Sequence, residues 1–357
     1  MNVSEEFLVP TGRIIKEYIT EYGISQKELS KRIGLSEKHI SHLLNGDSRL
    51  TEDVALKLEK IIPNIPASYW INMESKYQEY IARQKEEKRI ENENLEELSK
   101  RFKFNEVFKD LGWNLKKQAI EMLKLLKISD FSNFENAYED LAVKFFQDGG
   151  EKEAIAVWIN LCESEVEIQN NDLKDIAYDE NKLISSLNLF KKLAYNTNIE
   201  QSLISCKKLL NKLGIYFVVC EAITNCKVRG VLTTYNNHPA IYISKRFKTH
   251  DHIWFAIMHE IAHLIKHYNK NTINVSYEKD DKSTDIKEIE ANDFSRNFWI
   301  DKEEYNNFIK ENNFSEEKIS TFAKKQNILD GIVVARLQHD GLLKMDKLNY
   351  KKINTKK

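Results

Sequence analysis

Two histidines and a glutamate stand at a spacing that can hold and use a metal ion. They are His259, Glu260 and His263. On a helix, positions i and i+4 lie one above the other, so both imidazoles can bind one cation. Glu260 is rotated by about 100° from His259 and can serve as a general base toward a water molecule on that cation. The pattern predicts a hydrolytic site with Zn²⁺ as its cofactor.

The helix that carries these residues is predicted to be buried. Apolar side chains surround it on nearly every side: Trp254, Phe255, Ile257, Met258, Ile261, Leu264 and Ile265. A helix that is apolar all round lies in a core, and two buried histidines with a buried glutamate need partners. A metal ion is one such partner. The alternative is a pair of histidines that hydrogen-bond inside an ordinary core.

A catalytic zinc site uses three protein ligands and keeps a fourth position open. Acids at 278–281 stand in a polar stretch that reads as a loop. In the helix predicted over residues 285–300, we expect the apolar side chains to mark the buried face: Ile286, Ile289, Phe294 and Phe298. Glu290 borders that face and is the candidate third ligand, an exposed glutamate without a role being the alternative. Glu288 is expected to face solvent, and Asp293 could orient a ligand histidine.

The N-terminal residues favour a different chemistry, contact with DNA. Ser25 and Glu28 form a predicted capping box for a helix that ends at Gly34, and Ser36 begins the next helix. Two short helices that meet at a tight turn are typical of a helix-turn-helix. In the second helix Lys38 could reach guanine or phosphate and Asn45 could pair with adenine. The full set of candidate DNA contacts is Gln26, Lys27, Glu37, Lys38, His39, Ser41, His42 and Asn45.

The alternative for this segment is a helical module that binds only protein. Residues 1–62 contain nine Lys or Arg and ten Asp or Glu, and the whole chain of 357 residues has a formal net charge of −1. That balance excludes a highly basic coat. Any contact with nucleic acid must therefore come from a local patch of the surface.

The turn residues and the composition predict a mainly α protein in several parts. Residues 1–82 form an all-α helix-turn-helix domain, residues 83–103 a charged linker helix, and residues 104–199 a helical connecting region. Residues 200–345 form an α+β domain with a small sheet, and residues 346–357 a basic tail. Three short strands are predicted for the sheet, at 215–220, 230–234 and 240–244.

The bulk properties point to a cytoplasmic protein that does not enter a membrane. The four cysteines form no Cys-x-x-Cys pair and are expected to be reduced. The first residues lack the pattern of a signal peptide. No stretch of 18 or more apolar residues occurs, so no membrane span is expected.

Residues 10–80 resemble the XRE-type helix-turn-helix, in particular HigA-like antitoxin repressors. The segments that carry the likeness are ISQKELSKRIGLSEKHISHLLNGDSRLTEDVALKLEKII and PASYWINMESKY. The resemblance implies a homodimer that binds a palindromic operator in double-stranded DNA.

Residues 200–343 resemble the ImmA/IrrE family of metallopeptidase domains. The likeness lies in the motif helix and its flanks, then in EIEANDF and ILDGIVVARLQHDGLL. It implies that the α+β domain is zincin-like, with a gluzincin-like zinc site in which His259, His263 and Glu290 are ligands and Glu260 is the catalytic acid and base. The chain departs from the family pattern at Ser295 and at residues 299–301, which affects packing and not the ligands.

Two functions of different classes follow. The preferred hypothesis is a DNA-binding transcriptional regulator whose zinc-dependent endopeptidase cleaves a repressor or another regulatory protein. The alternative is a HigA-like antitoxin that represses its operon and binds a cognate toxin, with a peptidase-like domain that only binds protein or senses a ligand. A phage-related or defence regulator is a third hypothesis, for which the sequence offers no discriminator.

Overall fold

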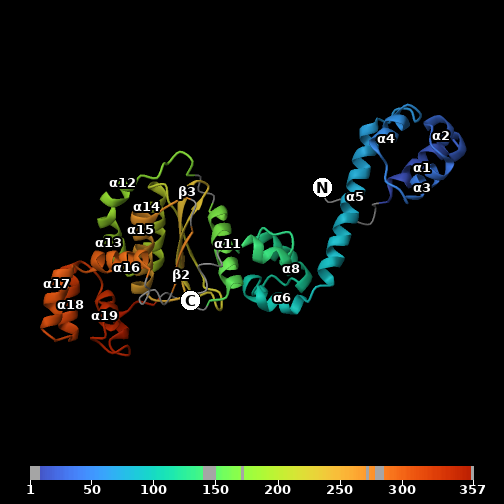
Figure 1. The fold of residues 1–357 in the computed structure, drawn as a ribbon. Coiled ribbons are helices and arrows are strands. Elements are labelled where there is room, and N and C mark those ends of the chain that lie inside the picture. The colour runs from blue at the N-terminus through green and yellow to red at the C-terminus, as the bar shows by residue number, and fades with distance from the viewer. Residues whose placement is uncertain (1–8, 140–149, 170–172, 271–272, 278–284, 355–357) are drawn as a thin grey trace. The chain divides into compact units, whose positions relative to one another are not determined.

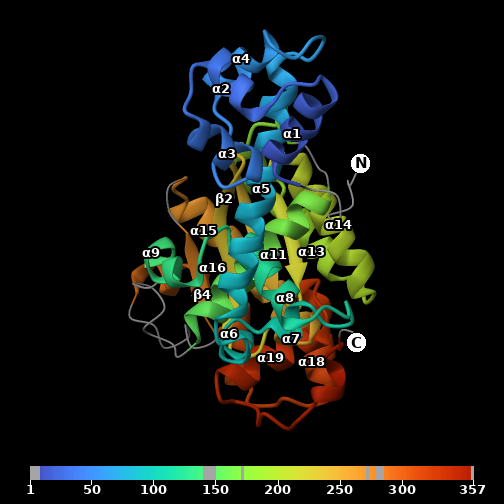
Figure 2. The same ribbon diagram turned by 90° about the vertical axis from the view of Figure 1, so that its right-hand side faces the viewer.

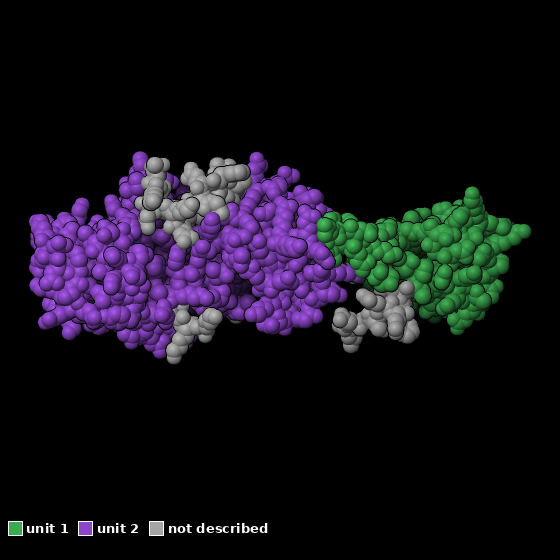
Figure 3. Space-filling view, turned by 90° about the horizontal axis from the view of Figure 1, so that it is seen from below, with its two compact units in different colours: residues 1–95 green, residues 96–357 purple. Residues whose placement is uncertain are grey.

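The computed structural model describes residues 9–139, 150–169, 173–270, 273–277 and 285–354. The chain divides into two compact units, Met1–Leu95 and Glu96–Lys357, coloured separately in Figure 3. Each unit has its own apolar core. Within the described residues, no helix is both long and apolar enough to cross a bilayer.

The described part of the first unit is all helical. Its elements are α1 (Thr11–Glu21), α2 (Gln26–Ile33), α3 (Glu37–Asn45), α4 (Glu52–Glu59) and α5 (Ala67–Glu91). The two serine caps follow the prediction, since Ser25 Oγ accepts from the Glu28 N–H and Ser36 Oγ from the His39 N–H. The Glu28 carboxylate, which the predicted capping box directs back to Ser25, pairs with Arg32 instead. Helix α5 continues into the stretch that the sequence predicted to be a charged linker helix.

Helices α2 and α3 both end at a glycine in the left-handed region, and α2 ends where the sequence predicted. Gly34 has a φ of 76° and Gly46 a φ of 84°, which glycine adopts without the steric cost that a Cβ imposes. Between the helices, Ile15, Leu29 and Ile40 fill the core. The short turn holds α2 and α3 in the arrangement that defines a helix-turn-helix.

The second unit begins with helices and continues as a layered α+β fold. Its first helices are α6 (Leu95–Arg101), α7 (Phe104–Val107), α8 (Leu115–Leu125), α9 (Phe134–Ala137), α11 (Lys152–Ile168), α12 (Glu180–Ser185), α13 (Leu187–Ala194) and α14 (Ile199–Lys212). Helix α11 covers one face of the sheet, and α14 and α15 (His250–His267) cover the other (Figure 1). The mainly helical character predicted from the sequence is confirmed.

The sheet has four strands, one more than the sequence predicted. Its order is β1-β3-β2-β4, from β1 (Tyr216–Cys220), β2 (Val228–Tyr235), β3 (His238–Ser244) and β4 (Asn274–Tyr277). Strand β1 is parallel to β3, and β2 is antiparallel to both β3 and β4. The additional strand, β4, lies in the stretch that was expected to be a loop. The rest of that stretch, including the acids at 278–281, lies outside the described residues.

Helix α15 is the centre of the second unit. It packs on β2 and β3 of the sheet, on α16 (Ile286–Trp299) and on α19 (Asp330–His339), as Figures 1 and 2 show from two sides. Helices α17 (Lys302–Lys310) and α18 (Glu316–Gln326) follow α16. The burial predicted for the motif helix is confirmed, since its side chains from Ile257 to Leu264 are all buried.

The residues after α19 pack against the start of α15. The backbone N–H of His250 donates to the carbonyl of Ile353 over 2.8 Å, and Thr249 forms a β-bridge with Asn354. Lys352 Nζ lies 3.7 Å from Asp251 Oδ2. The described part of the segment predicted to be a basic tail therefore contacts the helix that carries the motif.

Candidate metal centre

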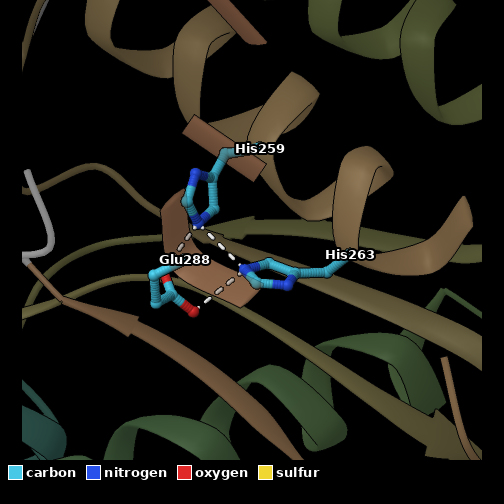
Figure 4. A group of neighbouring side chains, drawn as sticks. All are labelled: His259, His263 and Glu288. Atoms are coloured by element: carbon cyan, nitrogen blue, oxygen red, sulfur yellow. Dashed lines mark hydrogen bonds and ion pairs between the residues drawn. The ribbon is translucent and has the colours of Figure 1, made fainter. Parts of the chain in front are cut away.

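Two imidazoles and one carboxylate converge between α15 and α16. The Nε2 atoms of His259 and His263 lie 3.0 Å apart. Glu288 Oε2 is 3.1 Å from His259 Nε2, and Glu288 Oε1 is 3.0 Å from His263 Nε2 (Figure 4). The i, i+4 spacing thus brings the two histidines together as predicted. Among the described residues, these three form a group that could hold a metal ion.

The third member is Glu288, and the expectation for Glu290 does not fit the geometry. The buried face of α16 consists of Ala291, Asn292, Ser295 and Trp299. Glu288 falls on that stripe, because Asn292 and Ser295 follow it by four and seven residues. The isoleucines that were expected to mark the buried face are exposed instead, Ile286 by 72% and Ile289 by 45%. Glu288, which was expected to face solvent, is only 12% exposed.

Glu290 lies outside this group and contacts it through a third histidine, His267. Its carboxylate is 46% exposed, and its Oε2 lies 2.9 Å from His267 Nε2. His267 Nδ1 is in turn 3.2 Å from His263 Nδ1. Asp293, the residue expected to orient a ligand histidine, is 63% exposed and pairs with Arg296. The geometry therefore gives His267 the place that the sequence-based hypothesis gave Asp293.

Burial sets the protonation of the group. Burial lowers the pKa of His259, which favours the neutral imidazole that binds metals. Burial alone would raise the pKa of Glu288, but hydrogen bonds with His259 and His263 hold it well below the usual range. The donor set is two imidazole nitrogens and one ionised carboxylate, which suits Zn²⁺ and leaves a fourth position to be filled.

Glu260 is fully buried beside the sheet. An ideal Cβ on Gly230 of β2 would lie 2.4 Å from Glu260 Oε1, so the absence of a side chain there makes room for the carboxylate. Burial raises the pKa of Glu260 to about 7, against the opposing effects of His263 and Ser276. A carboxyl group with such a pKa can both accept and donate a proton near neutral pH.

The signals that could have found the missed residues are modest. Glu288 begins a stripe of small and polar residues at helical spacing, which apolar periodicity overlooks. His267 stands four residues after His263, where it shares a helix face. Gly230 begins the strand predicted at 230–234, and a glycine in a strand often marks a bulge or a close approach.

The candidate DNA-contacting residues are mostly at the surface of the first unit. In α3, Glu37, Lys38, His39, His42 and Asn45 are exposed and Ser41 is half-buried. The opposite side of α3 carries Ile40, Leu43 and Leu44 into the core. In α2, Lys27 is exposed and Gln26 half-buried. This division of inward and outward residues agrees with the sequence pattern; contact with DNA remains a prediction.

Comparison with known families identifies one segment in each of the two units. Residues 15–70 match the family described as helix-turn-helix, and residues 212–338 match the family described as IrrE N-terminal-like domain. The first match covers α1 to α4 and the second covers the sheet with α15, α16 and α19. None of the curated proteins matches the chain. The protein thus joins an XRE-type helix-turn-helix domain to an IrrE-like peptidase domain.

Proposed function

We propose that this protein is a DNA-binding transcriptional regulator whose second unit is a zinc-dependent endopeptidase. The observation that carries the proposal is the convergence of His259, His263 and Glu288 within 3.1 Å of one another, next to the buried Glu260. Three protein ligands with an adjacent acid are the composition of a catalytic zinc site, whereas structural zinc sites have four protein ligands.

Each residue has a distinct part in the proposed reaction. His259, His263 and Glu288 hold the metal; when bound, zinc supplies Lewis acidity toward a peptide carbonyl and acidifies a water molecule. Glu260 takes the proton from the attacking water and passes it to the departing amide nitrogen. Through its contact with His263, His267 fixes the orientation of that imidazole, and Glu290 fixes His267.

The substrate we propose is a repressor or another regulatory protein. The support is physical: a DNA-binding unit and a peptidase in one chain raise the effective concentration of the peptidase near proteins on the same DNA. The first unit would bind its operator as a homodimer through α3, with Lys38 and Asn45 at base edges.

Replacing Glu260 by Gln tests the proposal. The change keeps the shape of the side chain and removes the base, so zinc should stay near one per chain while cleavage falls by about 10²–10⁴-fold. The assay uses the purified protein and the product of the neighbouring gene, with Glu303→Gln on the exposed face of α17 as control. Equal cleavage by both variants would exclude Glu260 as the base. A parent protein that binds zinc and cleaves nothing would favour the antitoxin hypothesis.

A further inference from the structure

A cavity of about 130 Å³ lies between β2, α15, α16 and α19. Apolar side chains from three of these elements line it, among them Phe255, Trp299 and Ile332. Phe255 stands one helical turn before His259, and their rings are 6.2 Å apart. For scale, an engineered cavity of about 150 Å³ in another protein holds one benzene molecule. The space beside the metal centre therefore fits a group the size of one ring.

The polar lining of this cavity is cationic. Arg229, Arg296 and Arg336 contribute to it from β2, α16 and α19, and Asp251 is the acid among the lining residues. Asp251 is 3% exposed and already lies close to His252, at 3.2 Å, and to the cationic Lys352, at 3.7 Å. Three arginines from separate elements around an apolar floor suit a ligand that has both a negative charge and an apolar body.

A β-bulge directs Arg229 toward this cavity. Strand β2 places Val228 opposite Tyr277 and Gly230 opposite Ser276, so Arg229 is the extra residue between two adjacent partners in β4. Such an extra residue re-aims a side chain. The guanidinium of Arg229 lies over the ring of Phe255, 5.6 Å from its centroid, while the neighbouring Gly230 faces Glu260 on the same helix. One irregularity in the strand thus serves both the metal centre and the cavity.

The arginines keep their positive charge beside the nearby acids, because a guanidinium group is not deprotonated in proteins. Asp340 contacts Arg336 Nε at 2.8 Å and also accepts from Tyr305. Asp293 lies 3.5 Å from Arg296 and is 63% exposed, so water and salt screen its charge. Neither Asp340 nor Asp293 lines the cavity. At the rim, His252 and His339 are 44% and 38% exposed, which gives a ligand a way in.

We propose that this cavity binds a small organic anion, a ring-sized apolar body that carries a phosphate or carboxylate group. The apolar part would lie on Phe255 and Trp299, and Arg229 and Arg296 would bind the anionic group. Either a free small molecule or a side chain of a bound protein could present this chemistry. The proposal does not depend on peptidase activity, because binding is measured without cleavage.

Titration of the full chain with phenyl phosphate, followed by calorimetry, tests the proposal. We expect saturable binding near one per chain in both zinc-loaded and metal-depleted protein, and weaker binding of the neutral benzyl alcohol. A peptide that bears phosphotyrosine distinguishes the two sources: tighter binding than phenyl phosphate indicates a protein side chain, and weaker binding indicates a free molecule. Absence of saturable binding, or equal binding of benzyl alcohol, would overturn the proposal.

Matched variants locate the site. Arg229→Gln and Arg296→Gln should each weaken phenyl phosphate binding by about tenfold, since each removes a hydrogen bond to a charged group. Lys318→Gln removes the same charge from α18, away from the cavity lining, and should leave binding unchanged. Ala335→Leu fills the cavity without a change of charge and should abolish the binding of phenyl phosphate. If the arginine variants and Ala335→Leu bind like the parent, the ligand occupies another place.

Discussion

Gly230 provides the space that the Glu260 carboxylate occupies. An added Cβ would lie 2.4 Å from Glu260 Oε1 and 2.9 Å from its Cγ, and the glutamate is 0% exposed and cannot swing into solvent. We expect Gly230→Ala to lower the free energy of unfolding by about 1–3 kcal/mol, as overpacking does, and to impair cleavage. Thermal unfolding of the parent and the variant measures the first effect.

A second substitution separates a clash with Glu260 from a general defect of the strand. If the added methyl group acts through Glu260, then Glu260→Ala should remove the clash and recover most of the stability that Gly230→Ala loses. The double-mutant cycle gives the coupling free energy directly. Strictly additive losses would show that Gly230 serves β2 for another reason.

Glu288 and Glu290 differ by two positions on α16 and should differ in their effect on zinc. Glu288→Ala removes a proposed ligand, so we expect zinc to be lost to a competing chelator. Glu290→Ala acts only through His267 on His263, so we expect the zinc to stay and its affinity to fall, within the 10–100-fold range of outer partners. Competition with a coloured chelator measures both. Retention of zinc in the first variant and loss in the second would reverse the assignment.

The relative positions of His259, Glu260 and His263 could be predicted from the sequence, because one helix holds them at a fixed spacing. The burial of Glu288 beside these histidines could not be predicted, since the buried face of α16 depends on what packs against it. Glu288 does lie about 160° round the helix from Ile286, since each residue turns the helix by about 100°. The error was to take Ile286 as buried, when it is 72% exposed. Apolar character alone therefore chose the wrong face.

At the scale of elements, β4 is a strand that its own residues do not predict. Its four residues are Asn274, Val275, Ser276 and Tyr277, too short and too polar to stand out as a strand. The strand exists because its backbone pairs with β2, about 45 residues earlier in the chain. The same pairing creates the bulge at Arg229, so neither feature could be predicted from nearby residues. The helices of the first unit were predictable because their capping residues, Ser25, Gly34 and Ser36, act on neighbouring residues in the sequence.

The contact of α1 with α3 depends on Gly12. An ideal Cβ at this position would lie 1.6 Å from the carbonyl oxygen of Leu43, which belongs to the backbone and cannot turn away. We expect Gly12→Ala to force the two helices apart, at a cost of more than about 3 kcal/mol, and to abolish operator binding. Fluorescence anisotropy with labelled operator DNA measures the loss.

Gly23→Ala is the matched control in the same unit. Its Cβ would meet no atom within 4 Å, although its φ of 67° makes alanine unfavourable by about 1–2 kcal/mol. DNA binding at moderate temperature should therefore survive. Equal losses in the two variants would mean that backbone strain, and not the approach of α1 to α3, explains the effect of Gly12→Ala.

For the whole molecule, two units with separate cores predict two separable activities. Removal of zinc by a chelator should abolish cleavage and leave the affinity of the full chain for operator DNA unchanged. The fragment of residues 1–95 should bind the same operator, with an affinity that falls steeply with salt as counterions are released. Gel-shift titrations with and without chelator measure this. A marked loss of DNA binding on zinc removal would show that the units are coupled.

The recognition helix can be tested in the same full-length background. Lys38→Ala together with Asn45→Ala should weaken specific binding by about 10–10³-fold, the range expected for lost contacts to one or two base pairs. Cleavage by the second unit should continue. Unchanged operator affinity in this variant would remove α3 from the proposed DNA interface, even if the chain still binds DNA.

The contact between the segment after α19 and the start of α15 can form only late in the synthesis of the second unit. The hydrogen bond from the His250 N–H requires the carbonyl of Ile353, which the ribosome adds about a hundred residues later. At about 5–20 residues per second, this delay is on the order of 5–20 s. By then the whole first unit has left the ribosome, so every residue of its core is present and the unit can fold. A translational pause before residue 352 would therefore leave a folded DNA-binding unit joined to a motif helix whose first turn lacks these contacts.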